Sequence, residues 1–138
     1  MKVVEVVAGV ALRGDKALLV QRHPHPLASW SEGWCFAGGK VEPGETFSYA
    51  LAREWREELD AQVLVDDLVH CMVYRTDGYP HPYRVRTFRL RLTGSLQLQR
   101  AGGQAVRWVT LSELADLKAL NGTVDAFKAC LALPRRPQ

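Results

Sequence analysis

The sequence predicts an α+β fold built around a mixed β-sheet. Two apolar runs rich in β-branched residues open the chain as a hairpin, and one long amphipathic helix follows. The later strands and helices do not alternate in regular βαβ units, which favours α+β over α/β. The length of 138 residues fits one domain with a single core. We expect this domain at 1–133 and a frayed tail at 134–138.

The first part of the chain has the pattern of a hairpin followed by a short strand. Residues 3–12 form a buried strand by composition, and after a turn residues 17–22 form a second. A loop with two prolines at 23–32 is expected to be exposed. Trp34–Phe36 then forms a short strand that runs into a pair of glycines.

A long amphipathic helix is predicted over about Thr46 to Leu59. Its apolar residues recur every four positions and predict one buried stripe: Phe47, Leu51, Trp55 and Leu59. Glu54, Glu57 and Glu58 stand at i, i+3 and i+4, so they share a neighbouring face. Like charges this close destabilise a bare helix, so we expect the folded chain to hold a cation there.

The second half of the chain adds three strands and two helices. The strands are expected at 62–74, 83–92 and 106–109, and the last helix at 124–133. The alternation of the second of these strands slips in phase near Thr87 and Phe88, which suggests a bulge. Thr110 is a plausible N-cap of a short helix, because Glu113 three residues on completes a capping box.

Composition sets limits on the functional class. The formal net charge of +3 suits small anionic molecules, but it is too weak and scattered to predict stable nucleic-acid binding. Cys35, Cys71 and Cys130 have no metal-ligand spacing, which favours a reducing, cytoplasmic setting. The first residues have no signal-peptide pattern, and no apolar run approaches the roughly 20 residues that span a bilayer. We expect a monomer or a homodimer without membrane partners.

The stretch from Gly39 to Ala61 resembles the Nudix box, G-x5-E-x7-R-E-U-x-E-E-x-G-U, where U is a bulky aliphatic residue. The residues in register are Gly39, Glu45, Arg53, Glu54, Glu57 and Glu58. Trp55, Asp60 and Ala61 depart from the pattern, but none of these changes removes a carboxylate. Asp60 replaces a helix-ending glycine, and aspartate tolerates the left-handed conformation better than most residues. The resemblance implies the Nudix fold, a mixed sheet sandwiched between α-helices.

The resemblance also implies a reaction. Nudix enzymes hydrolyse a nucleoside diphosphate linked to another group X, with Mg²⁺ or Mn²⁺ held by oxygen ligands. The metal ligands implied are Glu57, Glu58, Glu54 and the carbonyl of Gly39. Glu54 is either a ligand or the base that accepts the proton of water. Arg53 is implied to orient a box glutamate, and Glu45 to assist as a supporting group or helper base. The alternative is a solvated helix face in which Arg53 pairs with Glu57.

The group X is less strongly indicated. Residues 34–43, which include Gly38 and Lys40, resemble the MutT-type branch, whose members cleave 8-oxo-dGTP or CTP to the monophosphate and pyrophosphate. Arg22 matches an arginine that contacts nucleotide in such enzymes, and a solvated strand end is an equal alternative. Asn121 can pair with a base edge, but with Gly122 it also makes a natural turn.

Other features of the branch are absent or ambiguous. The loop at 100–104 lacks the glutamate that MutT-like enzymes often carry, and only Gln104 could assist there as a neutral group. Five aromatic residues are possible base-stacking groups, although packing is the more common role: Trp30, Trp34, Tyr74, Tyr79 and Phe88. The rival functions are an ADP-ribose or nucleotide-sugar pyrophosphatase and a Nudix-like module that binds nucleotide without cleaving it.

Overall fold

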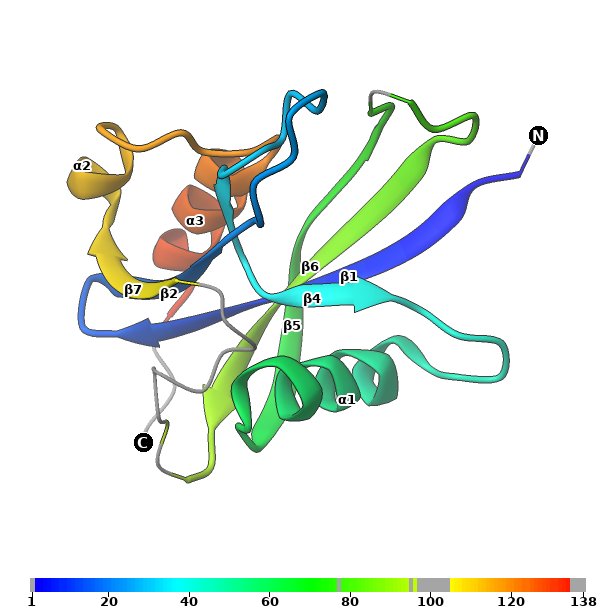
Figure 1. Ribbon diagram of the computed structural model, residues 1–138. Coiled ribbons are helices and arrows are strands. Elements are labelled where there is room, and N and C mark those ends of the chain that lie inside the picture. Colours follow the sequence, from blue (N-terminus) through cyan, green and yellow to red (C-terminus); the bar gives the residue numbers. More distant parts are fainter. Residues whose placement is uncertain (1, 77, 95, 97–104, 135–138) are drawn as a thin grey trace.

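The computed structural model describes residues 2–76, 78–94, 96 and 105–134. Its elements in chain order are β1 (Val4–Arg13), β2 (Lys16–Gln21), β3 (Trp34–Cys35), β4 (Gly38–Lys40), α1 (Phe47–Leu59), β5 (Val63–Tyr74), β6 (Tyr83–Leu92), β7 (Val106–Thr110), α2 (Leu111–Leu114) and α3 (Thr123–Ala132) (Figure 1). Within the described residues, no helix is long and apolar enough to cross a membrane.

The sheet is mixed, as the α+β prediction requires. Its main path runs β3-β2-β1-β6-β5, with β4 added beside β1 and β7 beside β2. Strands β1 and β6 are parallel, and the other pairs are antiparallel. Figure 1 shows α1 apart from α2 and α3, with the long strands between them. The predicted fold class is therefore confirmed.

Strand β1 carries the packing of both sheet faces. Val7 and Ala11 belong to a buried cluster that contains the apolar residues of α1, whereas Ala8 and Val10 belong to a second cluster that contains the apolar residues of α3. Successive side chains of a strand point to opposite faces, so one strand supports both helices. This places α1 and α3 on opposite sides of β1.

The long helix α1 begins and ends at residues that the sequence indicates. The Thr46 hydroxyl caps its first turn by accepting from the Tyr49 N–H at 3.1 Å. Asp60 ends it in the left-handed conformation, with φ 52°. The predicted apolar stripe is correct for three of its four members. Phe47 is instead 36% exposed, because it opens the helix at the rim, where its ring lies beside the Phe88 ring and the Arg86 guanidinium.

Strand β4 was not predicted, because a glycine pair reads as a loop. In the structure Gly38 pairs with Ala8 and Gly39 with Val7 in an antiparallel ladder. A side chain at Gly38 would collide with the Val7 carbonyl oxygen. The glycines therefore serve close approach of two strands rather than a turn.

The predicted bulge is present beside Thr87 and Phe88 of β6, but it belongs to the neighbouring strand β5. The β5–β6 register shifts between Val65 and Leu68, and again between Leu68 and His70, opposite Phe88 and Thr87. The extra residues belong to β5, so the bulges are in β5 and not in β6. The phase slip in the sequence of β6 therefore reflects the bulges in its partner strand β5.

The end of the described chain is held by the sheet. The capping box of α2 is confirmed, with both hydrogen bonds between Thr110 and Glu113 present. Helix α3 begins at Thr123, one residue before the predicted start. Pro134, the first residue of the predicted tail, accepts a hydrogen bond from the Arg89 guanidinium at 2.6 Å. Residues 135–138 lie outside the described part of the chain.

Replacing Asp60 by glycine should stabilise the protein. The positive φ at this position strains an L-residue and suits glycine, so Asp60→Gly should raise the free energy of unfolding by about 0.5–1 kcal/mol in urea denaturation. Gly14→Ala is the matched control, since Gly14 also has a positive φ, 62°, with open space around its Cα; it should lower stability. A less stable Asp60→Gly protein would mean that the aspartate side chain stabilises this helix end.

Candidate active site

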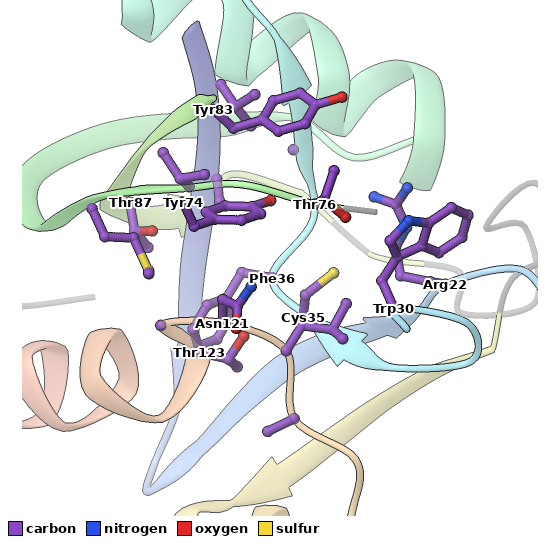
Figure 2. A pocket seen from close by; sticks show the side chains of 18 of the residues that line it. Arg22, Trp30, Cys35, Phe36, Tyr74, Thr76, Tyr83, Thr87, Asn121 and Thr123 are labelled. Carbon is purple, nitrogen blue, oxygen red and sulfur yellow. The ribbon is translucent and has the colours of Figure 1, made fainter. Parts of the chain in front are cut away.

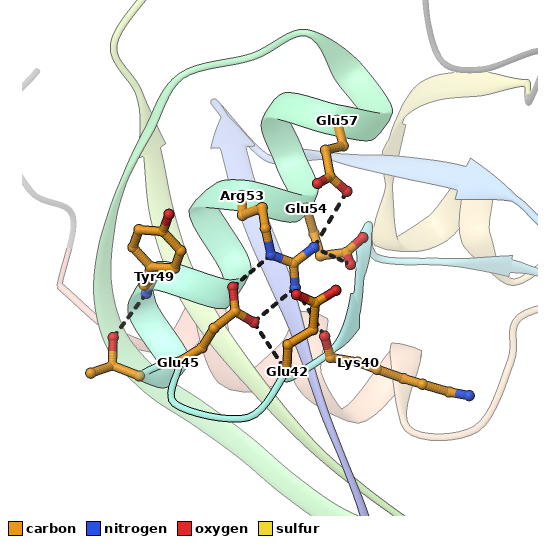
Figure 3. Close-up of polar contacts among 8 residues, drawn as sticks. Lys40, Glu42, Glu45, Tyr49, Arg53, Glu54 and Glu57 are labelled. Carbon is orange, nitrogen blue, oxygen red and sulfur yellow. Dashed lines mark hydrogen bonds and ion pairs between the residues drawn. The ribbon is translucent and has the colours of Figure 1, made fainter.

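One arginine organises the acidic residues of the box (Figure 3). Arg53 donates two hydrogen bonds to the Glu45 carboxylate: its Nε lies 2.6 Å from Oε2, and its Nη2 lies 2.9 Å from Oε1. Its Nη1 donates to Glu54 at 2.9 Å and to Glu57 at 3.3 Å. The Arg53 side chain is only 13% exposed, so its charge is screened less by solvent than that of a surface arginine.

The same guanidinium ties α1 to β4 and to the loop between them. Its Nη2 donates to the Lys40 carbonyl at 3.1 Å. Glu45 in turn accepts from the Glu42 N–H at 2.8 Å, which closes the loop on itself. The loop turns at Gly44, whose φ of 83° requires glycine. The helix, the loop and the strand thus meet at one cation.

The pairing of Arg53 with Glu45 shifts the pKa values of both side chains. The hydrogen bond from Arg53 is the main reason that the pKa of Glu45 lies below its ordinary value of 4.5, and the Glu42 N–H lowers this pKa further. The same bond from Glu45 raises the pKa of Arg53. Both partners therefore stay charged across the neutral range.

The three box glutamates differ in exposure. The Glu54 side chain is 15% exposed and that of Glu57 is 58% exposed. The pKa of Glu58 is raised to about 8, chiefly by burial and then by the charge and hydrogen bond of the neighbouring Glu54. A positive charge would relieve this crowding of carboxylates.

The donor set fits a hard divalent cation. A side chain at Gly39 would clash with the Glu54 carboxylate, so that carboxylate lies directly against β4. Carboxylate and carbonyl oxygens are the ligands that Mg²⁺ and Mn²⁺ prefer. Within the described ranges, however, no three His, Cys, Asp or Glu side chains converge closely enough to hold an ion. Arg53 holds two of the three glutamates in this state.

A cavity of about 470 Å³ opens on the other side of β4 (Figure 2). The residues predicted from the sequence to bind substrate all line it: Arg22, Gly38, Lys40 and Asn121. Gly39 lines it as well, and its Cα faces the Glu54 carboxylate. The glycine pair is therefore the thin wall between the cavity and the acidic helix.

Arg22 stands where the cavity comes near the glutamates. Its guanidinium lies 4.9 Å from the centre of the Trp30 ring, a cation–π contact also seen in Figure 2. Its charge lowers the pKa of Glu58, although burial outweighs this effect. No carboxylate of the described chain lies within ion-pair distance of Arg22, so its charge is available to an anion.

Stacked tyrosines form the opposite wall. Tyr74 and Tyr83 stack at 5.8 Å between ring centres, and Tyr79 stacks on Tyr83 at 5.1 Å. Of the aromatic candidates, Trp30 and Tyr74 line the cavity, whereas Trp34 and Phe88 pack with the two cores. Sequence reasoning missed Tyr83. Its signal was the strand pairing that sets it opposite Tyr74.

Asn121 occupies the turn before α3, at the cavity wall. Gly122 has a positive φ of 78°, so the predicted turn is present. The Asn121 side chain is exposed and makes no hydrogen bond to other described residues, which leaves its amide open to a ligand. Buried Thr87 and Thr123 lie nearby and were not singled out from the sequence. The loop at 100–104, with Gln104, lies outside the described residues.

Comparison with known proteins decides the family. The NUDIX domain family model matches residues 3–129. The chain belongs to the Nudix family. It is a Nudix hydrolase acting on nucleotide substrates, and hydrolases of this family generally use a divalent metal.

Relatives cover most of this Nudix chain. It is 36% identical over 137 residues to the CTP pyrophosphohydrolase of Escherichia coli (strain K12), covering 96% of this chain and 95% of the relative. It is 39% identical over 113 residues to a Mycobacterium tuberculosis protein whose name, 8-oxo-dGTP diphosphatase 2, is itself provisional, covering 81% and 77%. The solution structure of the E. coli ORF135 protein matches with a TM-score of 0.78 at 32% identity, covering 96% and 91%.

The Arg53–Glu45 bond should make stability depend on pH. A carboxyl with a lowered pKa in the folded state stabilises the fold above its unfolded pKa, and this stabilisation is lost as pH falls through the folded value. Glu45→Gln should therefore be less stable than the parent protein at pH 7, and the difference should shrink below about pH 4.

Urea denaturation of both proteins at several pH values measures this difference. Glu113→Gln is a useful comparison, because its carboxyl pKa is also lowered, mainly by the hydrogen bonds with Thr110 and only in smaller part by the charges of Lys16 and Arg107. High salt should reduce the effect of the Glu45 change more than that of the Glu113 change. A Glu45→Gln penalty that is equal at pH 7 and pH 3 would contradict the assignment.

Proposed function

We propose that this Nudix chain hydrolyses nucleoside triphosphates to the monophosphate and pyrophosphate, using Mg²⁺ or Mn²⁺. One observation carries the proposal. A cavity with an arginine and an open asparagine amide shares the wall of Gly38 and Gly39 with a helix whose Glu54 carboxylate lies against Gly39. A triphosphate reaching across this wall would have its base in the cavity and its phosphates beside the carboxylates.

The proposed metal ligands are Glu57, Glu58, Glu54 and the Gly39 carbonyl. Bound there, a divalent ion supplies neutralisation of phosphate charge and a water of lowered pKa. Glu54 serves either as a ligand or as the base that accepts the proton of that water. The site leaves no covalent step to the protein, so positioning dominates the contribution of its side chains.

Arg53 has a positioning role in this proposal. Its bonds to Glu54 and Glu57 at 2.9 and 3.3 Å hold two carboxylates on the face of the helix where the phosphates would lie. Its paired bonds with Glu45 fix the guanidinium itself. The longer bond between Arg53 and Glu57 would allow the Glu57 carboxylate to leave Arg53 and bind a divalent cation when one is present.

The cavity residues orient the nucleotide. Arg22 and Lys40 provide positive charge for phosphates, and Gly38 contributes backbone to the lining of the cavity. Tyr74 and Trp30 offer aromatic faces to a base, and Asn121 offers an amide that can both donate and accept. The names of the relatives make CTP and 8-oxo-dGTP the first substrates to test.

We also propose the extent of the domain and the cellular compartment, which rest on weaker signals. Residues 1–133 would form one catalytic domain. Cys35, Cys71 and Cys130 form no disulfide, which supports a reducing, cytoplasmic compartment. Burial raises the pKa of the Cys35 thiol to about 11, so this cavity residue is not a nucleophile at neutral pH.

A substrate panel tests the function. The protein is incubated with Mg²⁺ and CTP, the other (d)NTPs, 8-oxo-dGTP, ADP-ribose and nucleotide sugars, and the monophosphate and pyrophosphate are assayed. We expect pyrophosphate release from at least one triphosphate, and none when EDTA replaces Mg²⁺. Turnover of ADP-ribose or a sugar nucleotide alone would replace the proposal with the rival enzyme. Nucleotide binding with no turnover would replace it with a binding module.

A ligand variant gives the matching control. Glu57→Gln should lower kcat/KM by at least about a hundredfold, because it removes a proposed metal ligand. The free energy of unfolding should change little, because Glu57 is exposed and contributes little to packing. Asp125→Asn removes an exposed carboxylate from α3, on the opposite side of β1, and should leave activity within about twofold. Full activity in Glu57→Gln would remove Glu57 from the proposed site.

A further inference from the structure

The buried indole of Trp55 makes a directed contact in addition to packing. The residue is fully buried, and its Nε1 donates to the Ala37 carbonyl at 2.9 Å. A buried carbonyl costs free energy unless it is hydrogen-bonded, and a directed bond fixes distance more closely than apolar contact does. Trp55 occupies a position where the Nudix pattern has an aliphatic residue, which has no donor.

The accepting carbonyl is a junction of three elements. Ala37 lies between β3 and β4, and its oxygen also accepts the Gly9 N–H of β1 at 3.0 Å. Its two lone pairs are thus used by one bond from the sheet and one from α1. Ala37 is 1% exposed, so water does not compete for either bond.

The surrounding residues leave room for the indole. A Cβ at Gly9 would collide with the Leu90 side chain and would lie 3.0 Å from Trp55 Nε1. Glycine at position 9 therefore permits the approach of the indole to β1. An aliphatic side chain at position 55 would fill part of this space and would leave the second lone pair of Ala37 without a partner.

This bond lies beside the proposed metal site. Trp55 follows Glu54 in α1, and Ala37 precedes Gly38 and Gly39 in the strand. The Glu54 carboxylate lies against Gly39 so closely that no side chain fits between them. The bond between Trp55 and Ala37 therefore joins α1 to β4 within one or two residues of the point where ligand oxygens from both would meet.

We infer that Trp55 is a positioning residue: its indole N–H bond to Ala37 sets the spacing between the glutamate face of α1 and the Gly38–Gly39 strand, and thereby the affinity for the divalent cation. The inference rests on the proposed function, since it assumes a metal between these two elements. Trp55 itself touches neither the metal nor the nucleotide, because it is enclosed in the core.

The test removes the N–H donor at position 55 but keeps an aromatic ring there. Trp55→Phe and a protein with 3-benzothienylalanine at position 55, an indole isostere without the N–H, are compared with the parent. Mn²⁺ binding without nucleotide is followed by the electron paramagnetic resonance signal of the free ion. We expect both proteins to bind Mn²⁺ about tenfold more weakly. In turnover, kcat should fall and the half-saturating Mg²⁺ concentration should rise, with KM for nucleotide within about twofold.

Two controls separate this effect from a general loss of stability. Phe127→Leu alters the other core cluster and should reduce stability while leaving Mn²⁺ affinity unchanged. Trp55→Leu restores the aliphatic residue of the family pattern and should bind Mn²⁺ no better than Trp55→Phe. The isostere keeps the shape of the indole, so it decides the question even if the phenylalanine protein fails to fold.

The outcomes are distinct. Parental Mn²⁺ affinity in the isostere protein, with an active parent, overturns the role of Trp55 and leaves the proposed function standing. A parent protein that neither binds Mn²⁺ nor hydrolyses any nucleotide overturns the proposed function, and this inference with it. Weaker Mn²⁺ binding in Phe127→Leu as well would reduce the Trp55 effect to one of stability and overturn the inference.

Discussion

The Arg53 guanidinium, partly buried among three carboxylates, is the group on which the site depends. It holds Glu45 at 2.6 Å and lies within 3.3 Å of Glu54 and Glu57, while it also donates to the Lys40 carbonyl of β4. Partly buried charges are costly unless they are paired and hydrogen-bonded, so removal of this cation would leave several carboxylates uncompensated. The same cation neutralises part of the charge that would otherwise oppose formation of α1.

Close packing allows this cation to serve two elements at once. Because Gly38 and Gly39 have no side chains, β4 lies against β1 on one side and against the Glu54 carboxylate on the other. Trp55 adds a bond from the helix to the carbonyl that precedes these glycines. The result is a thin wall, with the cavity on one side and the acidic helix on the other.

Local signals in the sequence predicted helix α1 and its two ends well. Thr46 and Asp60 mark the ends of α1 by their capping chemistry, and the spacing of the glutamates indicates their shared face. Signals that need a partner strand were missed. Strand β4 exists because β1 accepts it, Tyr83 enters the cavity wall because it pairs with Tyr74, and the bulges lie in β5 although the phase slip is in β6. Phe47 fits the apolar period but lies at the rim, since periodicity does not tell how far the sheet extends.

The proposed function requires that one wall of glycines separates a base-binding cavity from a metal site on α1. The decisive measurement is a crystal structure with Mg²⁺ and a CTP analogue whose α,β-bridging oxygen is replaced by a methylene group. We expect Mg²⁺ bound to box glutamates and to the Gly39 carbonyl, the phosphates beside Arg22, and the base against Tyr74 and Asn121. A nucleotide bound outside this cavity, or Mg²⁺ bound away from Glu54, Glu57 and Glu58, would overturn the proposed function.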